Sequence, residues 1–339
     1  ILTTSSDPAR ARENGRFYEE AFRARGAAVA EWIPLTADHP ARADDPALAE
    51  RVRGYDVFFF GGGDQTRYTR VLLREGGRDS AVLAAMREVF TGRGAVIAGT
   101  SAGAAALVSA PMVTGGESHD ALARPRRLRD RPAGGLGFFR WGLIDTHFAE
   151  RGRQGRLIRL AARRDVELAF GVDEDTALVV ERPLGDRPRF RVIGRGGVGV
   201  FDLARARYPR GGRFRIEGVR AHYLTRGDRY DPRTRRPSIA RWKQPDARPR
   251  GARRADRADL FSAVDPATGR RARPRAFVRT SMAASSSRAP VVGHPAGDPS
   301  WVVTVRRGRG AGRFRGVDRG RAAASYRNMR VDIRPRARR

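Results

Sequence analysis

The chain has 339 residues, and its 68 Lys and Arg residues against 37 Asp and Glu residues give a formal net charge of +31. It contains no cysteine, which excludes a disulfide scaffold, a thiolate zinc site, an iron–sulfur cluster and a cysteine nucleophile. The length fits one large domain with an appendage, or two domains, and the longest apolar runs are too short to span a bilayer.

The positive charge comes almost entirely from arginine, because Lys243 is the only lysine. Selection for phosphate contacts along a nucleic acid would use both residue types, so this composition indicates coding bias in a GC-rich genome. The arginines are spread along the chain, and no basic run is interleaved with aromatic residues as a base-stacking surface requires. We therefore expect no specific nucleic-acid partner, but we expect nonspecific attraction to polyanions at low salt.

Alternating helices and strands are predicted for residues 1–245. The helices are expected near residues 6–25, 46–52, 67–75 and 81–90, and the strands near 27–34, 55–60 and 95–100. Such alternation predicts a mainly parallel sheet with helices on both faces, and ligands bind beyond the carboxyl ends of its strands. The first residue, Ile1, reads as part of a strand, so we expect a segment upstream to have been removed, and the compartment stays undetermined.

Short β segments replace this alternation from about residue 190. They are expected at residues 190–193, 198–203, 214–219 and 221–224, and two further strands at 301–305 and 329–333. Residues 246–275 are rich in Arg, Pro, Ala and Asp and have little periodicity, which is typical of a linker. We therefore expect a first domain over residues 1–245 and an Arg-, Pro- and Gly-rich extension over 246–339, whose role the sequence does not indicate.

The clearest chemical signal is the sequence Gly-Thr-Ser-Ala-Gly at residues 99–103, between a predicted strand and the small-residue helix 104–108. This is the G-x-S-x-G pattern of a nucleophile elbow. A tight turn there would lift Ser101 out of the sheet, and the N-terminus of the helix would direct free N–H groups at a developing oxyanion. We expect Ser101 to be a nucleophile; the alternative is a serine that only caps the helix.

Three glycines, residues 61–63, end the other buried strand and are followed shortly by Gln65. On its own such a triplet indicates only a tight turn. Beside a nucleophile elbow it is a candidate oxyanion donor, and we expect the N–H group of Gly62 or Gly63 to act together with that of Ala102. Gln65 would then hold a substrate amide or carboxylate.

A serine nucleophile needs a general base, and His147 is the leading candidate among five histidines. It follows the predicted strand 142–146, which places it at the same sheet edge as Ser101, and His119 is second. The carboxylates that could orient the imidazole are Asp173, Glu174, Asp175 and their rival Glu117. Three arginines on the first turns of the helix after His147 are either a solvated face or carboxylate clamps: Arg151, Arg153 and Arg156.

Several segments that lie in one order along the chain resemble the cyanophycinase branch of the serine peptidases related to aspartyl dipeptidase (peptidase E). They are residues 61–65, 99–104, 144–153, 156, 171–176 and 227–231. The resemblance implies an α/β fold like that of class I glutamine amidotransferases (flavodoxin-like). That fold is a three-layer arrangement of a parallel sheet flanked by helices, here with extra short β segments towards the C-terminus. The resemblance also implies a homodimer, a peptide or polymer substrate, and neither a metal nor an organic cofactor.

Matching the motifs residue by residue, the resemblance implies roles for individual side chains. The triad would be Ser101, His147 and Glu174, and the oxyanion hole expected from the two turns, Gly62, Gly63 and Ala102, would serve it. The substrate-binding residues would be Gln65, Asp145, Thr146, Arg151, Arg153 and Arg156. Thr146 departs from the family pattern, because many cyanophycinases have glutamine directly before the histidine.

The implied activity is that of a serine exopeptidase. It would hydrolyse cyanophycin (multi-L-arginyl-poly-L-aspartate) to β-Asp-Arg dipeptides through an acyl-enzyme. The departure at Thr146 leaves open an aspartyl or isoaspartyl dipeptidase on the same scaffold. A catalytically silent binding protein, with its Arg-rich tail docked to an acidic partner, is the alternative from another class.

Overall fold

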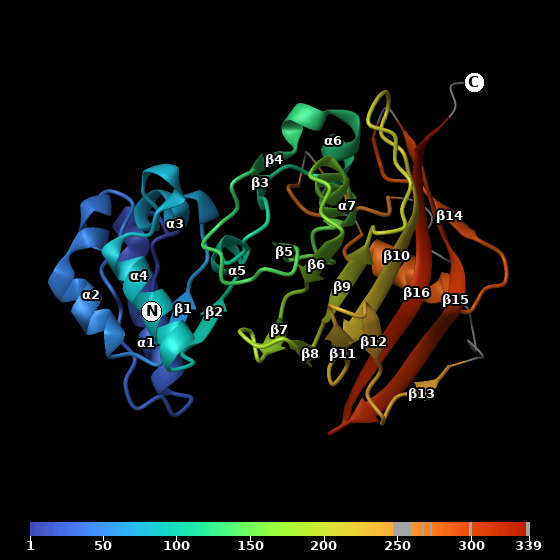
Figure 1. Ribbon diagram of the computed structural model, residues 1–339. Helices are drawn as coiled ribbons and strands as arrows, with labels where there is room; N and C mark the ends of the chain where they lie inside the picture. The colour runs from blue at the N-terminus through green and yellow to red at the C-terminus, as the bar shows by residue number, and fades with distance from the viewer. Residues whose placement is uncertain (247–258, 266–267, 272, 298–299, 337–339) are drawn as a thin grey trace. The chain divides into compact units, whose positions relative to one another are not determined.

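The protein, seen in a computed structural model that describes residues 1–246, 259–265, 268–271, 273–297 and 300–336, has a mixed α/β fold (Figure 1). Its chain forms two units, which we call unit 1 (residues 1–114 and 130–140) and unit 2 (residues 115–129 and 141–339). Much of the expected linker over 246–275 falls on residues 247–258, which lie outside the described residues. No helix in the described ranges combines the length and the apolar character that crossing a membrane requires.

Unit 1 contains the alternation of helices and strands that the sequence predicts. β1 (Val57–Phe60) pairs in parallel with β2 (Val96–Gly99), and Leu2 forms parallel bridges to β1 and to Ile33. The strand expected at 27–34 is reduced to that bridge. The helices of the unit are η1 (Pro8–Arg10), α1 (Ala11–Arg23), η2 (Pro40–Asp44), α2 (Pro46–Arg53), α3 (Gln65–Leu72), η3 (Glu75–Gly77), α4 (Ala81–Gly92) and α5 (Ala102–Ala106).

Polar side chains cap the first turns of α2, α3 and α4. The Asp45, Asp64 and Ser80 side chains accept hydrogen bonds from backbone N–H groups at the start of these helices. Each cap pairs a donor that the helix itself leaves open, which stabilises a helix by about 1 kcal/mol. The cap at Asp64 also fixes where the turn after β1 ends, and this turn carries the glycine triplet.

Unit 2 is built around an eight-stranded sheet. In spatial order its strands are β13 (Gln244–Pro245), β15 (Trp301–Asp318), β16 (Arg321–Pro335), β10 (Ile216–Thr225), β9 (Gly197–Asp202), β6 (Leu168–Val172) and β5 (Leu143–Thr146), with β14 (Val291–Gly293) beside β15. β5 and β6 run parallel, and the other neighbouring strands in the described part of this sheet run antiparallel. The expectation of one mainly parallel sheet is therefore met only by the pairs β1–β2 and β5–β6.

A smaller sheet and several helices complete unit 2. The sheet has the order β12 (Arg236–Ser238), β11 (Arg229–Asp231), β8 (Arg189–Gly194) and β7 (Thr176–Glu181). The helices are α6 (Ser118–Ala123), η4 (Pro125–Arg127), α7 (Gln154–Arg163) and α8 (Ala276–Ala284). α7 packs on β5 and β6, and α8 packs on β15 and β16. The chain passes between the two units at β3 (Met112–Gly115), at β4 (Arg129–Arg131) and after Arg140.

The strands expected near the C-terminus belong to the large sheet of unit 2. β16 pairs with β10, and β15 pairs with β16. Both are much longer than the expected segments 301–305 and 329–333, and the expected segments 214–219 and 221–224 merge into the single strand β10. Backbone pairing therefore connects β16, which lies in the expected extension 246–339, with β10 of the expected first domain.

The only lysine of the chain is buried against a carboxylate. The Lys243 ammonium lies 2.7 Å from Asp228 Oδ1, and both side chains are fully buried. Lys243 also donates to Thr225 Oγ1 at 2.8 Å and to Ser325 Oγ at 3.0 Å, which links β10, β16 and the segment before β13. Removing one partner of such a pair leaves the other charge buried and uncompensated.

Lys243→Met is therefore expected to lower the free energy of unfolding by about 3–5 kcal/mol. Urea unfolding followed by circular dichroism measures the change. Arg241→Met removes an exposed cation two residues earlier; as the control, it should change the same quantity by less than about 0.5 kcal/mol. Equal effects of the two substitutions would contradict the role of the buried pair.

Candidate active site

Ser101 lies in unit 1, at the turn between β2 and α5, in a strained backbone conformation. Its φ of 51° and ψ of −119° lie outside the regions that residues with a side chain ordinarily adopt. The flanking glycines make this turn sterically feasible. A Cβ at Gly99 would lie 2.6 Å from the Gly103 carbonyl carbon, and a Cβ at Gly103 would lie 2.0 Å from the Phe60 oxygen. A strand, a strained serine and a helix in this order have the backbone arrangement that is typical of a nucleophile elbow.

The glycine triplet after β1 lies next to Ser101 within unit 1. A Cβ added at Gly62 would lie 3.2 Å from the Ser101 Cβ and 3.7 Å from its Oγ, so this backbone passes directly beside the hydroxyl. Ala102 is the first residue of α5, where the N–H groups have no acceptor within the helix. The turn and the helix start are the two places from which the sequence predicts oxyanion donors.

The same turn is anchored before it enters α3. The Ser5 hydroxyl donates to the carbonyl of Gly62 at 2.7 Å, and Gly63 has a φ of 142°, which favours glycine. Gln65 is the first residue of α3, and its Nε2 donates to the Val113 carbonyl at 2.6 Å. The Gly62 carbonyl and the Gln65 side-chain amide thus each form a hydrogen bond within the protein.

His147 lies in unit 2, directly after β5, and contacts Glu174. Its Nδ1 lies 2.8 Å from Glu174 Oε1. Because an ionised carboxylate only accepts hydrogen bonds, Nδ1 carries the proton of the neutral ring and Nε2 is the nitrogen that can take one up. The φ of 47° at His147 turns the chain sharply after the strand. A carboxylate that fixes the tautomer of an imidazole in this way is typical of a general base.

A buried cluster holds the loops that follow β5 and β6. Asp173 accepts hydrogen bonds from the Ala149 N–H at 3.0 Å and from the Tyr223 hydroxyl at 2.6 Å, and it lies 3.1 Å from Arg275. Burial raises the pKa of Asp173 to about 6, and the charge of Glu150 adds to the shift. Sequence patterns do not indicate Arg275, because it lies in a stretch that resembles a linker and reaches Asp173 only through the fold.

Glu117 and His119, the alternative acid and base, have other partners within unit 2. Glu117 lies 2.9 Å from Arg271. The His119 ring packs edge-on against Trp301, with 6.0 Å between the ring centroids. Of the four carboxylates weighed as partners of the imidazole, Glu174 lies within hydrogen-bond distance of it.

Asp145 and Arg156 form a buried bidentate ion pair. The Nε and Nη2 atoms of Arg156 each lie 2.6 Å from a different oxygen of Asp145, which is 1% exposed. Arg153 Nη1 adds a contact of 3.2 Å. Burial acts to raise the pKa of Asp145, but the charges of Arg156 and Arg153 outweigh it and lower that pKa. Both guanidinium groups are thus engaged by a carboxylate of the protein, which favours a positioning role for Arg156 over the expected substrate contact.

Arg151 is the exposed member of the three expected clamps. The helix expected to carry all three begins only at Gln154, so Arg151 and Arg153 precede it. Gly152, with a φ of 57°, interrupts any earlier helical turn. Thr146, the last residue of β5, is buried, and its carbonyl accepts a hydrogen bond from Arg153 at 2.7 Å.

Asp145→Asn is expected to lower the free energy of unfolding at pH 7 by about 3–5 kcal/mol, because it leaves the buried guanidinium group of Arg156 and the partly buried one of Arg153 without their carboxylate. The folded-state pKa of Asp145 is lowered from 3.8, so its contribution is complete above about pH 4 and is lost as the pH falls through the lowered pKa. Urea titrations of both proteins at several pH values measure the difference.

Asp165→Asn provides a matched control for that change. Asp165 is paired with Arg210, but the side chains are 55% and 84% exposed, and such surface pairs contribute at most about 1 kcal/mol. A loss at Asp145→Asn no larger than this, or one that persists unchanged in acid, would contradict the buried pair.

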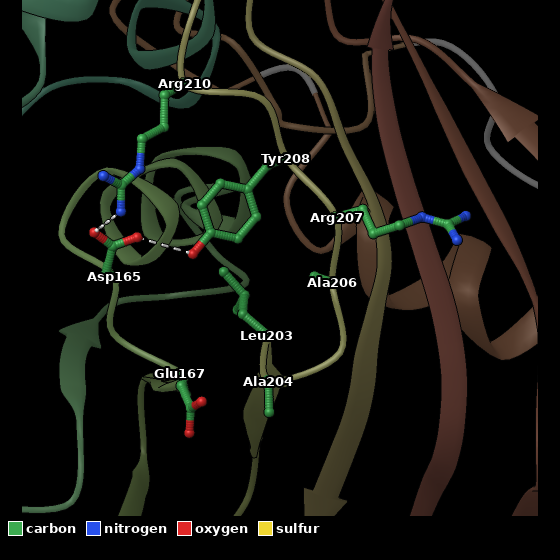
Figure 2. A pocket seen from close by; sticks show the side chains of 8 residues that line it. All are labelled: Asp165, Glu167, Leu203, Ala204, Ala206, Arg207, Tyr208 and Arg210. Carbon is green, nitrogen blue, oxygen red and sulfur yellow. Dashed lines mark hydrogen bonds and ion pairs between the residues drawn. The ribbon is translucent and has the colours of Figure 1, made fainter.

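A pocket of about 550 Å³ in unit 2 lies at the other end of β6 from Glu174 (Figure 2). Its lining includes Asp165 and Glu167, which precede β6, whereas Glu174 follows it. The Asp165 carboxylate pairs with Arg210 at 2.9 Å and accepts a hydrogen bond from the Tyr208 hydroxyl at 3.2 Å. Since it lies away from His147 and both of its carboxylates are paired with arginines, we assign this pocket no part in the candidate site.

Known proteins share sequence with this chain. Residues 14–183 match the sequence profile of Peptidase family S51. A cyanophycinase of Trichormus variabilis is 35% identical over 178 residues, which are 51% of this chain and 55% of that protein. A cyanophycinase of Synechococcus elongatus is 32% identical over 227 residues, 65% of this chain and 66% of that protein. The chain thus spans between about half and two thirds of the length of these curated relatives.

A solved structure also matches. The crystal structure of a peptidase from an acI-B1 Actinobacterium is 20% identical and covers 68% of this chain and 81% of its own, with a TM-score of 0.46.

Proposed function

Because the chain belongs to peptidase family S51, we propose that it is a serine exopeptidase that hydrolyses cyanophycin to β-Asp-Arg dipeptides through an acyl-enzyme. The relatives named cyanophycinase support this substrate. The observation that carries the proposal is the contact of 2.8 Å between His147 and Glu174, since an imidazole held at Nδ1 can accept a proton at Nε2. Ser101, on its strained turn, is the proposed nucleophile.

In the proposed reaction, His147 takes the proton of Ser101 while the serine oxygen attacks the scissile carbonyl carbon. Glu174 stabilises the imidazolium that forms. The N–H groups of Ala102 and of the turn at residues 62–63 stabilise the oxyanion. His147 then protonates the leaving amine, and a water molecule, deprotonated by the same imidazole, hydrolyses the acyl-enzyme and restores the serine.

Some of the expected substrate-binding residues would contact the substrate directly, and others would hold the site in place. Arg151 would pair with the free carboxylate at the end of the polymer, because a guanidinium binds a carboxylate bidentately. Gln65, held by Val113, would contact a substrate amide. Arg153 and Arg156 would act through Asp145, by holding the end of β5 in place before His147.

Parallel assays on cyanophycin granules and on short aspartyl and β-aspartyl dipeptides test this proposal. We expect β-Asp-Arg to be released from the granules, and no release by the Ser101→Ala chain. Hydrolysis of dipeptides alone would instead establish the aspartyl or isoaspartyl dipeptidase, which Thr146 in place of the family's glutamine favours. Hydrolysis of neither, with no labelling by a serine-directed reagent, would identify a silent binding protein.

The proposal extends to two features that members of the resembled family share. One is a homodimer, which sedimentation velocity over a range of protein concentrations tests. The other is the class I glutamine amidotransferase-like arrangement, which the parallel pairs β1–β2 and β5–β6 support.

A further inference from the structure

A second pocket in unit 2, of about 340 Å³, is lined mostly by arginine. Seven of its ten lining residues are arginines, in a chain where about one residue in five is Lys or Arg. Arg205, Arg236 and Arg309 are exposed at its surface. No acidic side chain of the described residues is among those that line it.

The positive charge of this pocket is only partly compensated. Asp202 lies 3.2 Å from Arg220 and 2.9 Å from Arg235, and Glu167 also pairs with Arg235. Within the described part of the chain, no other carboxylate forms an ion pair with the seven arginines, so five positive charges stay in excess. Burial and the charge of Arg220 lower the pKa of Arg330. Guanidinium groups gathered in this way repel one another and attract anions.

The pocket lies where the strand pairing of the large sheet is irregular. The register of β10 against β16 shifts between Ala221 and Tyr223, and that of β15 against β16 shifts between Arg307 and Gly312. These three strands lie side by side (Figure 1), and Asn328, at this level of β16, has a φ of 56°. Bulges redirect side chains and recur beside functional sites. Arg327 lies at the irregularity between β10 and β16, Arg309 lies at the one between β15 and β16, and both line this pocket.

His222 adds a buried donor beside these arginines. The ring is fully buried, and its Nδ1 accepts a hydrogen bond from the Asn328 N–H at 3.1 Å, so Nε2 carries the proton of the neutral ring. Burial, together with the charges of Arg220, Arg327 and Arg330, lowers the pKa of His222 to about 3. Nε2 has no acceptor among the described residues.

Two of the lining arginines also have a buried N–H group without an acceptor. The Nε atoms of Arg220 and Arg327 are buried and likewise have no acceptor in the described ranges. A buried donor without an acceptor costs about 1–3 kcal/mol. The lining arginines Arg220 and Arg327 therefore have hydrogen-bonding capacity that the described residues do not use.

The pocket lies away from His147 and Glu174. β9 runs antiparallel to β6, with Asp202 opposite Leu168 and Val198 opposite Val172. The arginines gather around Asp202, at the start of β6, whereas Glu174 follows its end. A ligand of this pocket is therefore separate from the peptide of the proposed reaction.

We propose that this pocket binds a small anion with two or three linked phosphoryl groups. Arginine forks match phosphate oxygens bidentately. A phosphoryl group carries about −1.5 to −2 charges at neutral pH, so two or three linked groups offset most of the excess of five, which a single carboxylate does not. The shared chemistry is a di- or triphosphate, either free or at the end of a nucleotide.

Isothermal titration of the full chain at near-physiological salt tests the proposal, with inorganic diphosphate in one arm and magnesium-free ATP in the other. We expect one site per chain. Arg236→Gln and Arg309→Gln, exposed and thus harmless to folding, should each weaken binding about tenfold. Arg321→Gln replaces an exposed arginine six residues before Arg327, and as the matched control it should leave binding unchanged.

The results distinguish a free anion from a nucleotide, and they show whether the pocket binds phosphoryl groups at all. Tight binding of diphosphate alone identifies a free anion, and tighter binding of ATP identifies a nucleotide. Binding of neither, equal weakening by Arg321→Gln, or equally tight binding of citrate would overturn the proposal. Ser101→Ala should bind diphosphate as the unsubstituted chain does, so a failure of the peptidase proposal would leave this result unaffected.

Discussion

Ser101→Ala is expected to lower kcat/KM on cyanophycin by more than about a thousandfold. The substitution removes the oxygen that would form the acyl-enzyme, and no other hydroxyl occupies that position of the elbow. The strained φ of 51° is retained, because alanine has the same backbone constraints. The free energy of unfolding should therefore change by less than about 0.5 kcal/mol. Initial rates of dipeptide release and urea unfolding measure the two quantities.

A residual rate above about a thousandth of the original would argue against Ser101 as the nucleophile. Ser109→Ala is a useful control, because this serine follows α5 closely in the same unit and donates to the Gly137 carbonyl instead. It should leave kcat/KM within about twofold of the original value, as expected for a residue outside the reacting groups.

His147→Ala is expected to be as damaging as Ser101→Ala, and the double variant little worse than either. The two residues act as one unit in the proposed mechanism, so the loss of one makes the other useless, and the free-energy costs do not add. Steady-state rates of the two single variants and the double variant measure the non-additivity. Losses that multiply would mean that Ser101 and His147 act independently, and the proposed mechanism would fail.

Glu174→Gln should lower kcat/KM by a smaller factor, since the amide still fills the position next to Nδ1 but no longer stabilises the imidazolium. Glu117→Gln and His119→Ala are the controls, because their side chains contact Arg271 and Trp301 instead. If either control lost more activity than Glu174→Gln, the acid and the base would have to be reassigned.

The local turns of the chain could be predicted from sequence because their causes are local. The strand before Ser101, the flanking glycines and the small residues after them together predict the tight turn that the structure contains. Polar caps at Asp64 and Ser80 likewise mark helix starts within a few residues of the expected ones. The catalytic roles of these residues stay predictions for the assays above.

Features that depend on distant pairing could not be predicted in the same way. The stretch 306–316 lacks alternating apolar residues, yet it continues β15, because backbone pairing with β16 holds it there. Arg156 is i+3 from Arg153, a spacing that suggests a shared exposed face, but Asp145 draws both inward. The spacing of the arginines does not show that they are buried, because their partner Asp145 lies on the strand β5.

Because Lys243 is the only lysine in the sequence and is buried, cleavage after lysine can be used to measure local unfolding of the chain. A protease that cleaves only after lysine has one target in the sequence, and that target is closed while the ammonium lies buried against Asp228. Cleavage therefore requires local unfolding, and its rate at low protease concentration follows the population of the open form. The two fragments are expected to stay associated after the cut, because β16 of the second is paired with β10 of the first. Their separation in denaturant would measure the strength with which the last strands are held.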